Sequence, residues 1–247
     1  MTDKQIIGSQ TAKNGFKNED DIVRKFNAWK TDSDAMQWLY LMKYDINEIE
    51  SVNAEKLYGW KTDVQVQVSI KLKKVMDVEN LQVKLVSNLK GFNQIDKHKL
   101  GKYEELWNIP KDILSILKRY TGEESPNIPN PKDKRRMFAN EFEIEETGHL
   151  LKWLSENQSM IISDILKGRG KFAAEWMLVV QKTTTNAQWT LKPMNYCMNF
   201  FGNGDITITE RGNIKIGRIT MQRKGGDNGR DTAKMLQFKI NPAELFK

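Results

Sequence analysis

Two segments of the chain alternate apolar and polar residues, and this period-two pattern predicts two half-buried strands. In residues 64–72 the apolar positions are Val64, Val66, Val68, Ile70 and Leu72. The polar positions, beginning with Asp63, share the opposite face. In residues 81–85 the apolar side chains point one way, so Gln82 and Lys84 lie side by side on the other face. The pattern therefore predicts a sheet with an acid, an amide and a lysine on one face.

These three side chains are typical of a metal-dependent nuclease. Asp63 and the Gln82 amide supply the hard oxygen ligands that Mg²⁺ prefers, and Lys84 beside the metal can position or deprotonate the water that attacks a phosphodiester. The spacing alone is a weak signal, because the same residues also occur by chance on the solvated strand faces of many α/β proteins. Both interpretations stay open on the pattern alone.

Glu19 is a further candidate for this site. We expect a helix capped by Asn18, in which Glu19 lies three residues before Ile22 and seven before Phe26 and shares their inward face. It is either a first-turn acid at the edge of the core or a third metal ligand that supplies the charge that Gln82 lacks.

The composition favours a globular protein with a polyanionic partner. The chain has 247 residues, of which 39% are hydrophobic, and Lys and Arg exceed Asp and Glu by 39 to 32. Two histidines and one cysteine exclude a Cys/His zinc site, so hydrolysis of a phosphate ester needs carboxylates. No apolar run reaches the length of a signal peptide or a membrane span, so we expect a soluble, cytoplasmic protein with no membrane partner.

The first of two polar segments, residues 90–99, predicts a loop that touches phosphates and bases. An aromatic or amide tip on such a loop can wedge a base step. The alternative is an ordinary loop before a helix, with its aromatic residue turned inward. The candidate contacts are Phe92, Asn93, Gln94, Lys97 and His98.

The second segment, residues 222–230, combines three glycines with three cations. Its Arg and Lys side chains suit guanine, and its Asp and Asn suit cytosine and adenine, so base readout is the preferred interpretation over a charged hairpin turn. The candidate contacts are Gln222, Arg223, Lys224, Asp227, Asn228 and Arg230. Solvated surface is the default expectation for two weaker basic stretches, residues 132–136 and 168–170.

Several ordered motifs together resemble the Type II restriction endonucleases that cleave GCGC. The resemblance runs from near residue 8 to the carboxyl end at similar spacing. It is carried by residues 15–19 (GFKNE), 62–63 (TD), 82–88 (QVKLVSN), 92–98 (FNQIDKH), 132–138 (KDKRRMF) and 222–230 (QRKGGDNGR).

The resemblance implies an α/β protein with the PD-(D/E)xK nuclease fold, a mixed central sheet flanked by helices with a DNA-recognition extension. Its motif is degenerate here, with Thr62 in place of proline and Gln82 in place of an acid. The implied catalytic residues are Asp63, Gln82 and Lys84. The implied cofactor is Mg²⁺, held by Asp63, Gln82, the Val83 carbonyl and Glu19, and the product carries a 5′-phosphate.

By the same resemblance, residues 92–98 enter the minor groove of double-stranded DNA and residues 222–230 read GCGC.

Prolines 126, 129 and 131 mark an irregular connection, so we expect a catalytic core over residues 1–125 and a recognition part over 126–247, packed as one elongated unit. A homodimer formed away from the DNA is compatible with this, and a cognate DNA methyltransferase is the expected functional partner. The alternatives are a repair or recombination nuclease of the same fold and a non-catalytic, sequence-specific DNA-binding protein.

Overall fold

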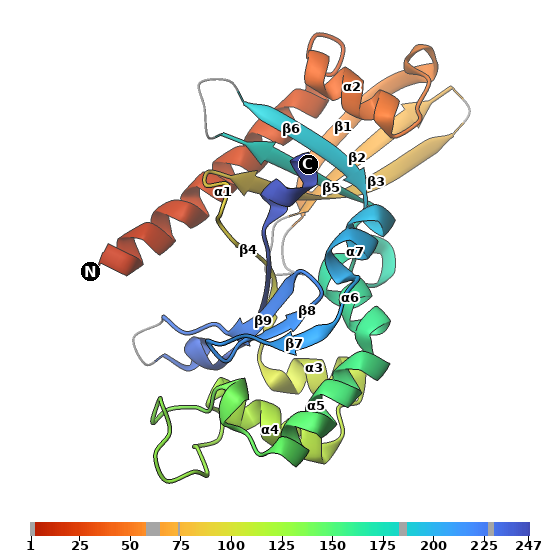
Figure 1. The fold of residues 1–247 in the computed structure, drawn as a ribbon. Coiled ribbons are helices and arrows are strands. Elements are labelled where there is room, and N and C mark those ends of the chain that lie inside the picture. The colour runs from red at the N-terminus through yellow and green to blue at the C-terminus, as the bar shows by residue number, and fades with distance from the viewer. Residues whose placement is uncertain (1–2, 58–64, 74, 183–186, 227–229) are drawn as a thin grey trace. The chain divides into compact units, whose positions relative to one another are not determined.

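The chain folds into two compact units that interleave along the sequence. The computed structural model describes residues 3–57, 65–73, 75–182, 187–226 and 230–247 (Figure 1). The first unit comprises residues 1–93, 167–197 and 241–247, and the second comprises residues 94–166 and 198–240. The single boundary expected near residue 125 is therefore wrong, because elements on both sides of it complete the first unit.

The first unit is built on a mixed five-stranded sheet in the order β1-β2-β3-β5-β6. Its strands are β1 (Ile49–Leu57), β2 (Gln65–Leu72), β3 (Met76–Val86), β5 (Trp176–Gln181) and β6 (Gln188–Pro193). Neighbouring strands are antiparallel except β3 and β5, which are parallel. This sheet confirms the predicted mixed α/β class, and it places β3 at the centre.

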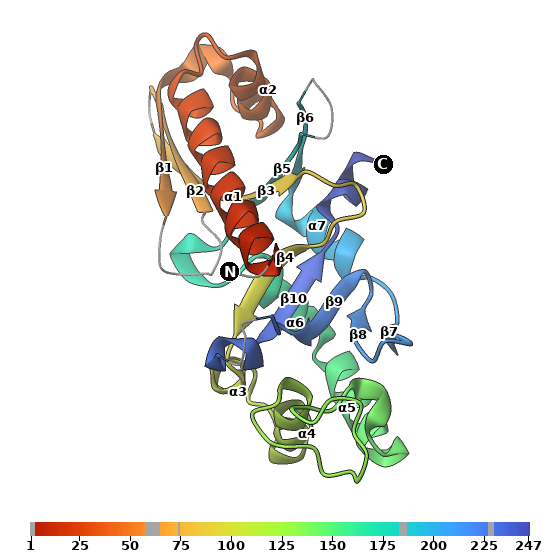
Figure 2. The same cartoon turned by 90° about the vertical axis from the view of Figure 1, so that its left-hand side faces the viewer.

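Two helices cover one face of this sheet. Figure 2 shows α1 (Asp3–Asn27) running along β1 and β2, and α2 (Ser33–Leu41) follows it, capped by the Asp32 side chain. The apolar stripe of α1 packs with the apolar face of the strands in one core that contains Ile22, Phe26, Trp38, Val66, Val68, Ile70, Leu81 and Val83. The alternation of β2 therefore reflects burial against α1 and α2.

The start of α1 differs from the sequence expectation. The helix begins at Asp3, so Asn18 is a buried residue inside it and not its cap. The residues before Asn18 include no proline, and most of them are tolerant of helix, which lets the helix extend towards the amino end.

The second unit has its own five-stranded sheet, in the order β4-β10-β9-β8-β7. Its strands are β4 (Asn93–His98), β7 (Ile206–Ile208), β8 (Ile214–Ile216), β9 (Ile219–Arg223) and β10 (Leu236–Ile240). Its helices are α3 (Leu100–Trp107), α4 (Lys111–Thr121), α5 (Ile144–Glu156) and α6 (Gln158–Leu166). A further helix, α7 (Met194–Gly202), begins in the first unit and ends in the second. An aromatic cluster of Tyr103, Trp107 and Phe238 joins α3 to β10.

The predicted loop at residues 90–99 is wrong over most of its length, because residues 93–98 form strand β4. Ile95 and Asp96 are buried, and the Asp96 carboxylate accepts a hydrogen bond of 3.0 Å from the Tyr103 hydroxyl. A polar segment can form a strand when its buried acid accepts a hydrogen bond within the protein. Strand β4 was not predicted because its apolar residues do not alternate.

Single-turn 3₁₀ helices complete the structure at η1 (Ile46–Glu48), η2 (Ala139–Glu141), η3 (Gly170–Phe172), η4 (Asp231–Lys234) and η5 (Pro242–Phe246). Within the described ranges, no helix combines the length and the apolar character needed to cross a membrane.

Candidate active site and DNA-contact surface

Gln82 and Lys84 lie on one face of the central strand β3. Gln82 is the register partner of Gln65 in β2, and Lys84 is the partner of Val179 in β5, so both positions are enclosed by neighbouring strands. Val83 between them points into the core beneath α1. Gln82 is 0% exposed and Lys84 is 5% exposed. The polar pair is therefore buried, whereas an ordinary polar strand face would be solvated.

The buried amide of Gln82 has no partner among the described residues. Neither Oε1 nor Nε2 makes a hydrogen bond there, although buried polar groups are normally paired and an unpaired one costs about 1–3 kcal/mol. A carbonyl oxygen in this state is a suitable ligand for Mg²⁺ or for an ordered water. The position fits the predicted metal site on this observation.

The remaining predicted ligands are only partly described. Asp63 and Thr62 lie outside the described residues. Over the part of the chain that is described, no group of three or more His, Cys, Asp or Glu side chains could hold a metal. The described part of the site thus supplies an amide and a lysine.

Glu19 is buried on α1, at 8% exposure, on the helix surface that also carries Ile22 and Phe26. Those two residues belong to the same core as Val83, whereas Gln82 and Lys84 alternate with Val83 along β3. A role for Glu19 at the metal stays a prediction.

Asn80 is a residue of this strand face that the sequence analysis did not single out. Its Oδ1 accepts from Gln67 Nε2 at 2.9 Å, and its Nδ2 donates to the carbonyls of Lys171 and Ala173 at 2.9 and 3.1 Å. Its backbone carbonyl accepts from Glu175 at 2.9 Å. Asn80 therefore connects the segment before β5, through hydrogen bonds, to the strand that carries Gln82 and Lys84. Its place in the same alternation, two residues before Gln82, was the available signal.

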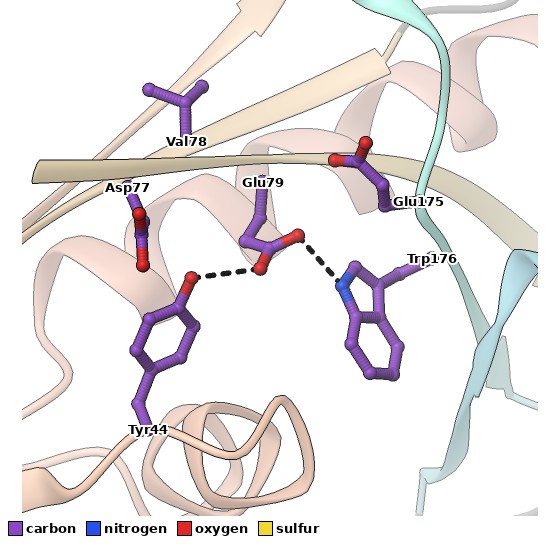
Figure 3. A pocket seen from close by; sticks show the side chains of 6 residues that line it. All are labelled: Tyr44, Asp77, Val78, Glu79, Glu175 and Trp176. Atoms are coloured by element: carbon purple, nitrogen blue, oxygen red, sulfur yellow. Dashed lines mark hydrogen bonds between the residues drawn. The ribbon is translucent and has the colours of Figure 1, made fainter.

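An open pocket of about 460 Å³ lies near the amino end of β3 and does not include Gln82 or Lys84 (Figure 3). Its lining residues are Tyr44, Asp77, Val78, Glu79, Glu175 and Trp176. The Glu79 carboxylate accepts hydrogen bonds from the Tyr44 hydroxyl at 2.8 Å and from Trp176 Nε1 at 2.9 Å. Three carboxylates in one pocket repel a phosphate, so this pocket is a poor site for a nucleic acid.

The structure brings the two predicted DNA-contact segments together on the second sheet. Gln237 of β10 pairs in register with Gln222 of β9, and its Nε2 donates to Gln94 Oε1 of β4 at 2.6 Å. Lys99, just after β4, forms an ion pair with Asp231. Segments more than a hundred residues apart in the sequence are thus neighbours on β4, β10 and β9.

The individual candidates in β4 and directly before it differ in exposure. Phe92 is 48% exposed, while Asn93 Nδ2 donates to the Leu85 carbonyl at 2.9 Å. Lys97 is half-buried. His98 lies 3.4 Å from Asp96 and packs edge-on against the Tyr103 ring. The expected alternative of an inward Phe92 is wrong, and His98 is held by its neighbours.

Two glycines among the described part of residues 222–230 have a left-handed backbone. Gly225 and Gly226 have φ of +62° and +75°, a conformation that L side chains rarely adopt, and the Lys224 and Gly225 amides donate to Met235 and Ala233. Arg223 is half-buried and Arg230 is exposed. Asp227 and Asn228 lie outside the described residues.

Comparisons with known proteins bear on the family and the fold. The family model for the R.HinP1I restriction endonuclease matches residues 42–246. A solved structure of the restriction endonuclease MspI in complex with its cognate DNA has the same fold, with a TM-score of 0.64 over 97% of this chain and 93% of that chain at 15% identity. No curated protein sequence matches the chain.

Proposed function

Because the chain belongs to the R.HinP1I restriction endonuclease family, it is a type II restriction endonuclease, and we propose that it cleaves double-stranded DNA within the palindrome GCGC. The observation that carries the catalytic assignment is the buried pair Gln82 and Lys84 on one face of the central strand. The MspI structure, which contains cognate DNA, supports a double-stranded DNA substrate. The formal charge of +7 favours the same polyanion.

Lys84 orients the attacking water in this proposal. Its Nζ is held at a buried position, where an ammonium group can fix a water in line with the scissile P–O3′ bond. The water oxygen bonds to phosphorus as the P–O3′ bond breaks. One proton of the water ends on the departing O3′ oxygen and the other leaves to solvent, so the products are a 5′-phosphate and a 3′-hydroxyl.

We propose that Asp63, Gln82 and the Val83 carbonyl hold Mg²⁺, with Glu19 as a further ligand. The Gln82 amide, which has no hydrogen-bond partner among the described residues, supports the assignment, and Asp63 is two residues before Gln65, the register partner of Gln82. When bound, the cation supplies charge that stabilises the phosphoryl oxygens in the transition state. A neutral amide binds it more weakly than a carboxylate does, so Asp63 is the dominant ligand.

For DNA recognition, we propose that residues 92–98 approach the minor groove and residues 222–230 contact the major groove of GCGC. Such a site contains only G·C pairs, whose guanine acceptors suit cationic side chains. The meeting of Gln94, Gln222 and Gln237 on one sheet supports a single contact surface. A homodimer formed away from this surface is compatible with the proposal, and a cognate methyltransferase protects the host's own sites.

Digestion of unmethylated plasmid DNA with Mg²⁺, followed by sequencing of the fragment ends, tests the proposal. We expect discrete fragments whose 5′-phosphorylated ends all lie within GCGC. Uniform ends at another palindrome would retain the mechanism and reject GCGC. Intact DNA after prolonged digestion, or random ends, would reject the proposed cleavage.

A further inference from the structure

Two arginines from different elements of the second unit converge. Arg136 precedes η2, and its guanidinium lies 3.8 Å from the Phe138 ring centre and 5.8 Å from that of Tyr120. The Tyr120 hydroxyl donates to the Met221 carbonyl at 2.9 Å, two residues before Arg223 on β9. Burial lowers the pKa of Arg223, and the charge of Arg136 lowers it further. The expected solvated surface is therefore wrong for Arg136, which is half-buried over aromatic rings.

Among the described residues, no carboxylate forms an ion pair with either arginine, although the charges of Asp133 and Glu141 act on Arg136. Arg136 Nη1 and Arg223 Nε are shielded from water and make no hydrogen bond to any described residue. The nearby carboxylates are engaged elsewhere. Asp133 accepts from Arg135 Nε and Nη2 at 2.9 and 2.8 Å, and Glu141 accepts from the backbone amides of Lys132 and Phe138, each at 2.7 Å.

We infer that Arg136 and Arg223 together bind one phosphate of the DNA backbone. The inference rests on the proposed function, since it needs DNA as the ligand. Two desolvated like charges repel each other, and an anion between them offsets that repulsion, whereas the neutral edge of a guanine does not. Guanidinium groups also match phosphate oxygens in geometry. This assigns Arg223 to backbone positioning, in place of the base readout expected from the sequence.

The test is equilibrium binding of Arg136→Met and Arg223→Met to two duplexes, with Ca²⁺ replacing Mg²⁺ to prevent cleavage. One duplex carries the cleavage sequence and the other carries a scramble of it. Methionine removes the charge and keeps an unbranched apolar side chain beside Phe138. We expect each variant to lose affinity by about 10–100-fold for both duplexes and to lower the salt slope by about one. Because the arginines share one phosphate, the double variant should lose less than the product of the single losses.

Arg135→Met is the matched control, because it removes the same charge from an adjacent residue whose side chain is 68% exposed and paired with Asp133. Its affinity should stay near that of the wild type. Unchanged binding by Arg136→Met, or a loss confined to the cleavage sequence, would overturn the inference. Failure of the wild-type protein to bind either duplex would instead reject the proposed function.

If Arg136→Met does not fold, a scan of single methylphosphonate linkages replaces it. At the linkage that the arginines share, removing the phosphate charge should weaken binding by the wild type but not by Arg223→Met. The absence of any such linkage would overturn the inference.

Discussion

At the scale of single residues, the face of β3 contrasts two buried amides. Asn80 satisfies its side-chain donors and acceptor within the protein, whereas Gln82 has no partner among the described residues. The first is explained by structure alone. No described group compensates the desolvation of the Gln82 amide. This state is expected of a group whose partner arrives with the substrate or the cation.

For Lys84→Ala we expect a cleavage rate at least about a hundredfold below that of the wild type, because the ammonium that orients the water is lost. Affinity for DNA should be retained, since one buried lysine contributes little to a large polyanion interface. Single-turnover cleavage and equilibrium binding separate the two effects. We expect the same loss of rate for Asp63→Ala.

Lys71→Ala provides the control for this substitution. Lys71 lies on the neighbouring strand β2, is exposed and pairs with Glu50, so its loss removes an equal charge without touching the site. Its rate should match that of the wild type. A Lys84→Ala enzyme that cleaves nearly as fast as the wild type would remove Lys84 from the mechanism.

At the scale of elements, Glu79 joins the segment after α2 to strands β3 and β5 through its bonds to Tyr44 and Trp176 (Figure 3). Burial raises the pKa of Glu79 above its ordinary value of 4.5, and the carboxylates of Glu175 and Asp77 raise it further, against the two hydrogen bonds. Because its pKa is raised in the folded state, Glu79 contributes stability that is fully present at pH values below its pKa in the unfolded chain. That stability is lost as the pH rises through the folded value.

Glu79→Gln should therefore change the pH dependence of unfolding. Because glutamine does not ionise, the free energy of unfolding of the variant, relative to the wild type, should rise as the pH increases from about 4 to 7. Urea denaturation across that range measures it. Glu104→Gln, which removes an exposed carboxyl group on α3, should show no such trend. A constant difference between Glu79→Gln and the wild type would contradict the assignment.

Elements with one apolar face could be predicted from the sequence. An element that buries a polar side chain could not. The alternation of Val66, Val68 and Ile70 identifies β2, because these side chains pack beneath α1 and α2. Strand β4 was missed, since its buried Asp96 depends on a hydroxyl from α3. The convergence of Arg136 and Arg223 depends on packing between distant segments, which no local pattern encodes. The shared face of Gln82 and Lys84 was predicted because side chains alternate along a strand.

At the scale of the whole molecule, the interleaving of the two units limits where the chain can be divided. The sheet of the first unit draws β1, β2 and β3 from residues before 94 and draws β5 and β6 from residues after 166. Its core likewise combines Val83 with Leu178, Val180 and Leu191. Neither of the two units is therefore one continuous stretch of this sequence.

A fragment of residues 1–125 should consequently fail to form the native first unit. It lacks β5, so the parallel edge of β3 is unpaired, and the core loses the apolar side chains that β5 and β6 contribute. We expect its urea unfolding, followed by tryptophan fluorescence and circular dichroism, to be broad and non-cooperative. The full chain should unfold in a sharp transition under the same conditions. A cooperative transition of the fragment near the midpoint of the full chain would show that residues 1–125 fold alone, and it would restore the boundary that the proline-rich connection suggested.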